Sequence, residues 1–123
     1  MHILVNIIFS IELALLFVHE MDAIRKQEWK MFIILKDMED EKAYRVFMLL
    51  HIPLYSAILY LLFSDYVRIG IYITDAFLII HLLIHFLFRN HSGNKLNNRL
   101  SKCIINTAGI IAIAHLAVYL IWI

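Results

Sequence analysis

Residues 74–88 read TDAFLIIHLLIHFLF. The run is almost wholly apolar, yet it carries one Asp and two His, so it is too apolar for a surface helix and too polar for a simple membrane anchor. Side chains four residues apart lie on one face of a helix, and His81 and His85 therefore point in the same direction. Ionisable groups inside a bilayer-spanning segment are costly, and they mark a candidate functional site.

Three further apolar segments accompany this run, and together the four predict a membrane protein. We expect spans at about residues 3–20, 44–63, 66–88 and 103–123, since a helix of about 20 apolar residues crosses a bilayer. Backbone groups in hydrocarbon must bond within their own segment, which favours helices. Of the 123 residues, 63% are hydrophobic. The predicted fold class is all-α: residues 1–123 form a single integral membrane domain, a four-helix transmembrane bundle.

The basic residues are distributed unevenly among the connections. They are Arg25, Lys26, Lys30, Lys36, Lys42 and Arg45 in the first connection, Arg68 in the second, and Arg89, Lys95, Arg99 and Lys102 in the third. Connections rich in Lys and Arg stay in the cytoplasm. We therefore predict that the first connection (between spans 1 and 2) and the third connection (between spans 3 and 4) are cytoplasmic and that both termini lie outside.

Charge and composition argue against several other classes of protein and of binding site. A formal net charge of +1 leaves no basic surface for nucleic acid. The single cysteine, Cys103, excludes an intrachain disulfide and a zinc site built from cysteines. Residues 1–18 lack the basic start and small-residue cleavage site of a signal peptide, so we expect a retained span. The expected partners are the lipid bilayer and either further copies of this chain, as a homo-oligomer, or another membrane protein.

The first connection mixes apolar and basic residues over about residues 21–36. This pattern predicts an amphipathic cytoplasmic segment, either a helical extension of the first span or a helix in the membrane interface. Trp29 would then lie at the level of the lipid headgroups.

The polar groups within the spans fall at two depths. Counting about 1.5 Å per residue from the cytoplasmic end, one group of residues lies about 6–12 Å deep and a second pair about 20 Å deep. The inner group is Glu12, His51, His81 and His85, with His19 and Glu20 at the cytoplasmic boundary. The deeper, secondary polar pair is Asp75 and His115. Asp75 is rotated away from His81 and aligns with Tyr72 and Arg68.

Imidazoles and a carboxylate at one depth are suitable ligands for a divalent metal such as zinc or iron. The predicted metal ligands are His51, His81, His85, Glu12, His19 and Glu20. An open coordination position would activate water and support a membrane hydrolase, whereas a closed site would be structural. The sequence does not select between these, so enzymatic activity stays undecided.

Three alternatives compete with a metal site. The polar groups can simply form hydrogen bonds between helices, as in a structural or regulatory membrane subunit. They can carry protons in a small transporter or channel that acts as an oligomer. They can also ligate haem axially, through His51 and His81. The sequence His19-Glu20-Met21-Asp22-Ala23 begins like a zinc-protease motif, but Ala23 stands where the second His is needed.

The stretch from His19-Glu20-Met21-Asp22-Ala23 to Glu28-Trp29, followed by His51-Ile52-Pro53, resembles an uncharacterised family of small bacterial four-span membrane proteins. The resemblance implies a multi-pass protein of the bacterial inner membrane and no established activity. It makes residues 19–29 a candidate functional segment. His19, Glu20 and Asp22 would be the first ligands that an ion meets, and Glu28-Trp29 would be an interfacial anchor.

Overall fold

Four long helices and one short 3-10 helix make up the computed structural model, which describes residues 2–122. They are α1 (His2–Arg25), η1 (Glu28–Met31), α2 (Asp40–Phe63), α3 (Val67–Leu87) and α4 (Arg99–Trp122). No strand occurs within residues 2–122, so the all-α prediction is confirmed. Each long helix is long and apolar enough to cross a membrane.

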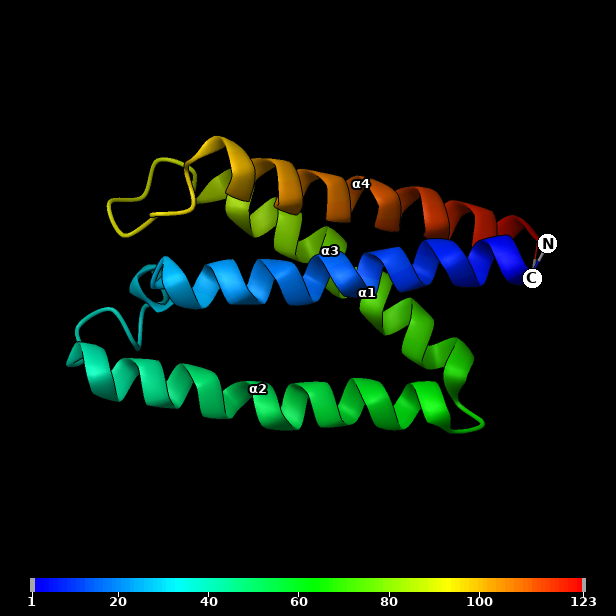
Figure 1. Cartoon of the computed structure of the whole chain (residues 1–123), viewed down its shortest axis with the longest axis horizontal. Helices are drawn as coiled ribbons and strands as arrows, with labels where there is room; N and C mark the ends of the chain where they lie inside the picture. The colour runs from blue at the N-terminus through cyan, green and yellow to red at the C-terminus, as the bar shows by residue number, and fades with distance from the viewer. Residues whose placement is uncertain (1, 123) are drawn as a thin grey trace.

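The helices pack as a bundle in which α4 lies against both α1 and α3, while α2 contacts α3 and η1 (Figure 1). Both ends of the chain lie at one end of the bundle, together with the short turn between α2 and α3 (Figure 1). The connection that contains η1 and the loop between α3 and α4 lie at the opposite end, which we call the connection end. These two basic connections touch, because Lys95 hydrogen-bonds to the Gln27 side chain.

Side-chain hydrogen bonds define the helix ends that position the site. The Asn98 side-chain oxygen accepts the backbone N–H of Ser101 at 2.9 Å, which is an N-cap for α4. The Ser101 hydroxyl then donates to the carboxylate of Asp22 in α1. Asp22 therefore joins the connection-end turns of α1 and α4.

Buried apolar residues fill the bundle in successive layers. At its middle lies the apolar layer, which we define as Leu16, Leu78, Ala108 and Ala112. A separate apolar cluster holds α2 against the first connection and consists of Ala23, Trp29, Leu35, Ala43 and Phe47. Trp29 is only 3% exposed, so its ring packs inside the protein and does not face lipid, while its depth at headgroup level stays a prediction. The ring packs on Tyr44 and Phe47.

The outward faces of the four helices are apolar as well. Large side chains such as Ile3, Phe63 and Ile121 are at least 75% exposed. Such faces fit contact with the hydrocarbon of a bilayer.

Gly109 permits the close approach of α3 and α4. A Cβ atom built at this position would lie 2.7 Å from the Cβ of Leu82. Gly109→Leu is therefore expected to lower the free energy of unfolding by about 1–3 kcal/mol through overpacking, measured by denaturant unfolding in detergent. Ile110→Leu, on the exposed face of the same turn, is the matched control and should change stability by less than about 0.5 kcal/mol. Equal stability of the two variants would contradict the close α3–α4 packing.

Candidate metal centre

The described residues contain two groups of ionisable side chains whose ligand atoms lie within 4.8 Å of one another. The first, which we call the His-Glu cluster, consists of His19, Glu28, His81 and His85. The second, which we call the Glu-Asp-His cluster, consists of Glu12, Asp75 and His115. The two clusters share no residue and are therefore separate sites.

Three elements build the His-Glu cluster at the connection end. His19 lies near the end of α1, and His81 and His85 lie one turn apart on α3. Glu28 comes from η1, beyond the end of α1. The residue before it, Gln27, has the left-handed backbone conformation, with φ 56° and ψ 50°. This conformation is uncommon for a residue with a Cβ, and it turns the chain sharply so that Glu28 returns toward His19.

The ring nitrogens of the three histidines converge. The Nε2 atom of His81 lies 2.6 Å from that of His19 and 3.1 Å from that of His85. The Glu28 carboxylate lies 3.2 Å from His85 Nε2, 3.5 Å from His19 Nε2 and 3.7 Å from His81 Nε2. Ligands at about 2.0–2.1 Å from a tetrahedral zinc ion are about 3.3 Å apart. The five distances scatter around that separation.

The convergence lies in a largely enclosed part of the bundle, since His19 is 2% exposed and Glu28 is 3% exposed. The three Nε2 atoms contact one another and the Glu28 carboxylate, so the ligand atoms of four side chains face one point. A cation at their centre would accept a lone pair from each ring and offset the carboxylate charge. One feature fits less well: His19 Nδ1 is buried and has no hydrogen-bond partner within residues 2–122, whereas metal-bound histidines usually donate from the second nitrogen.

A cavity of about 270 Å³ adjoins the cluster on the side of α2. His81 and Glu28 line it, and Glu20 and His51 line it as well. His51 Nε2 lies 2.8 Å from the Glu20 carboxylate, and His51 Nδ1 lies 2.7 Å from the carbonyl oxygen of Phe47, to which it donates. Both ring nitrogens of His51 are therefore engaged outside the cluster.

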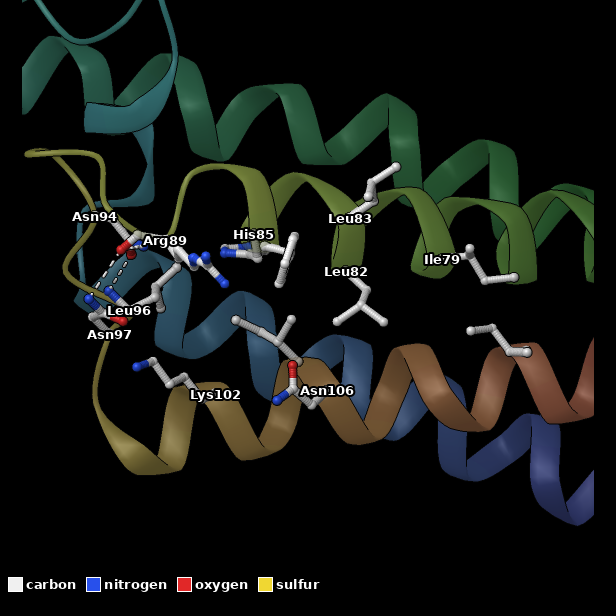
Figure 2. Close-up of a pocket in the computed structure, with 13 residues that line it drawn as sticks. Ile79, Leu82, Leu83, His85, Arg89, Asn94, Leu96, Asn97, Lys102 and Asn106 are labelled. Atoms are coloured by element: carbon white, nitrogen blue, oxygen red, sulfur yellow. Dashed lines mark hydrogen bonds between the residues drawn. The ribbon is translucent and has the colours of Figure 1, made fainter.

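A second cavity, of about 530 Å³, lies between α3 and α4 (Figure 2). His85 forms part of its wall, close to Arg89 and the amides of Asn94 and Asn97, and Leu82 extends the wall away from the connection end (Figure 2). The Asn97 amide donates to the carbonyl oxygen of Arg89 at 3.1 Å. The His-Glu cluster thus has a cavity on either side of α3.

The structure groups the predicted ligands differently from the depth estimate. His19, His81 and His85 lie together, whereas Glu12 lies in the Glu-Asp-His cluster. Glu20 and His51 pair with each other instead of joining the cluster. Glu28, which we expected to be an interfacial anchor, takes the place of the carboxylate. In the sequence, Glu28 is an acidic residue beside a Trp in the segment 19–29 that the family resemblance marks as functional, and nothing there identifies it as a ligand.

The Glu-Asp-His cluster lies on the other side of the apolar layer. His115 Nδ1 is 3.0 Å and 3.2 Å from the two carboxylate oxygens of Asp75 and 3.7 Å from the nearest oxygen of Glu12. Asp75 therefore contacts His115 rather than Arg68. Phe9 and Tyr119 cover the His115 ring. The three ionisable side chains come from α1, α3 and α4, and all are fully buried.

A family model described as "Family of unknown function (DUF6713)" matches residues 5–121. No curated protein and no solved structure matches the chain. The match agrees with the resemblance to an uncharacterised family.

Proposed function

We infer the function of this chain from its sites, because the chain belongs to a family of unknown function (DUF6713). We propose that it is a multi-pass protein of the bacterial inner membrane that binds one divalent transition metal ion, best zinc, in the His-Glu cluster. The observation that carries the proposal is the convergence of three imidazole nitrogens and one carboxylate within 4.8 Å, from three buried side chains and the half-buried His81. Three imidazoles and a carboxylate are a donor set that zinc accepts.

The number of protein ligands favours a closed site. Structural zinc sites use four protein ligands, whereas catalytic sites commonly use three and leave one position for water. The His-Glu cluster offers four side chains from α1, η1 and α3. A bound ion would therefore fasten the first connection to α3, and its principal effect would be on the stability of the connection end.

Two of the alternatives receive less support from the geometry. A continuous proton pathway is disfavoured because the apolar layer, with Leu16 only 1% exposed, separates the two ionisable clusters. Axial haem ligation is disfavoured because His51 is paired with Glu20 and the Nε2 atom of His81 faces two other imidazoles.

Metal analysis of the detergent-purified protein tests the zinc site. We expect wild-type protein that has been incubated with zinc and desalted to hold an ion in this cluster. The His81→Ala/His85→Ala variant should lose that ion, since it lacks half of the ligands. Folding of both proteins is checked by circular dichroism. A folded wild-type protein that retains no zinc, or a double variant that retains as much zinc as the wild type, would overturn the proposal.

A second candidate function, metal-dependent hydrolysis, is favoured by the cavity that Glu20 and His51 share with His81 and Glu28. A His–carboxylate pair beside a metal can move protons. An open coordination position is the requirement that distinguishes this function. Protein loaded with Co²⁺ should change its visible spectrum on addition of azide if that position exists. An unchanged spectrum would indicate that the site has no open coordination position and would count against hydrolysis.

We also propose that the connection end faces the cytoplasm, because it carries ten of the eleven basic residues. Single cysteines are placed at Lys36, Ser92 and Asp65 in a Cys103→Ser background. A membrane-impermeant thiol reagent added to intact cells should label position 65, in the turn between α2 and α3, and should leave positions 36 and 92 unlabelled until the cells are lysed. Labelling of 36 and 92 in intact cells would reverse the orientation.

A further inference from the structure

We propose that the Glu-Asp-His cluster is a second, independent cation site, with a preference for a harder divalent ion such as Mn²⁺ or Fe²⁺. The inference goes beyond the zinc site, because none of its three residues belongs to the His-Glu cluster. It concerns Glu12, Asp75 and His115, which three different helices bring together in the half of the bundle that holds the termini.

The first argument is the absence of hydrogen-bond partners. Both carboxylate oxygens of Glu12 and the Nε2 atom of His115 are buried and have no hydrogen-bond partner among the described residues. All three residues are 0% exposed. Buried polar groups are nearly always paired, and an unpaired carboxylate in a bundle interior is more costly still. His115 Nδ1 faces both the Asp75 carboxylate and Glu12, so a cation between the two carboxylates and Nδ1 would pair the oxygens of Glu12. Nε2 lies on the other side of the ring and would keep its proton.

The second argument is charge. With both carboxyl groups ionised, Glu12 and Asp75 would contribute two negative charges, and one divalent cation would balance them. Neutrality matters here because the site is enclosed by Phe9, Tyr119 and the apolar layer, without an exposed side chain to provide screening. No Lys or Arg is paired with either carboxylate in the part of the chain that the structure describes.

The third argument is the type of donor. The site offers two carboxylates and one imidazole, whereas the His-Glu cluster offers three imidazoles and one carboxylate. Carboxylate-rich sites suit manganese, whereas imidazole-rich sites suit zinc. The two clusters should therefore differ in preference as well as in position.

The fourth argument is separation. Glu12 and His19 are seven residues apart on α1, which is about 10 Å along the helix. Leu16 lies between them and belongs to the apolar layer, as does Leu78 between Asp75 and His81. The same side chains cannot serve both clusters, so occupancy of one site does not require occupancy of the other.

Manganese provides the test. The wild type and variants are expressed in medium supplemented with MnCl₂, purified in detergent and desalted, and protein-bound Mn²⁺ is counted by mass spectrometry and observed by electron paramagnetic resonance. Asp75→Asn and Glu12→Gln, which preserve side-chain size, should each lower bound Mn²⁺ at least tenfold. Asp65→Asn, the same substitution at an exposed position, should leave bound Mn²⁺ unchanged.

The His81→Ala/His85→Ala variant separates this inference from the zinc site. It should lose zinc and keep its Mn²⁺. Loss of Mn²⁺ in that variant would assign the ion to the His-Glu cluster and overturn the inference, as would unchanged Mn²⁺ in folded Asp75→Asn or Glu12→Gln protein. A wild-type protein that holds neither Mn²⁺ nor Fe²⁺ would also overturn the inference, and the carboxyl groups of the cluster would then be neutralised by protons. If one carboxylate variant does not fold, the other still decides the result.

Discussion

Removal of zinc from the wild-type protein is expected to lower its midpoint of thermal unfolding by about 12–20 °C. A ligand at about 1,000 times its Kd contributes about 4 kcal/mol, and each kcal/mol moves the midpoint of a domain of this size by about 3–5 °C. The effect should be large because the ligands join α1, η1 and α3, three elements that are otherwise held by side-chain packing. Unfolding curves with excess zinc and with a chelator measure the shift.

Two variants show whether the shift arises at the His-Glu cluster. The His81→Ala/His85→Ala protein should unfold at the same temperature with zinc and with chelator. His51→Ala also removes an imidazole near the connection end, and it should lower the starting stability while keeping the zinc-dependent shift. A wild-type midpoint that does not respond to zinc would refute the prediction, and a His51→Ala protein that no longer responds would restore His51 as a ligand.

Glu28→Gln is expected to weaken zinc binding by more than about 100-fold. Loss of an outer hydrogen-bond partner of a metal ligand costs about 10- to 100-fold in affinity, and Glu28 supplies the cluster's one carboxylate and lies within 3.7 Å of all three Nε2 atoms. The substitution keeps the size of the side chain and removes its charge. Competition with a chromophoric zinc chelator measures the affinity.

Glu20→Gln is the matched control, because Glu20 is the nearby carboxylate that pairs with His51. It removes the same charge near the same cavity, and its effect on zinc affinity should stay below about tenfold. If the two variants weakened zinc equally, the contribution of Glu28 would be general electrostatic attraction rather than ligation. If Glu20→Gln had the greater effect, the zinc-binding carboxylate would be Glu20, which the sequence predicts as a ligand, and not Glu28.

The four helices could be predicted because the signal for them is local. Each is a run of apolar residues, and the bilayer sets both its length and its helical backbone. The shared face of His81 and His85 was predictable for the same reason, since their spacing of four is a property of one helix. Both predictions depend on neighbours in the sequence and on no knowledge of packing.

The partners of Glu12, His51 and Glu28 depend on packing. Depth along a span does not fix the rotation of the helix about its axis, and that rotation directs Glu12 toward His115 and His51 toward Glu20. Glu28 depends on the left-handed conformation of Gln27. Gly or Asn would have indicated such a turn in the sequence, but Gln does not.

The position of Glu28 outside the long helices has a kinetic consequence. Three of the four proposed ligands lie on α1 and α3. The fourth, Glu28, lies in a four-residue 3-10 helix and follows Gln27, whose left-handed backbone conformation is costly for a residue with a Cβ. Displacement of that one turn would leave the ion with three ligands while the bundle stays packed. Local openings of this kind require less free energy than global unfolding. The residence time of the ion would then follow the mobility of the first connection, and a protein with very high thermal stability could still exchange its ion quickly.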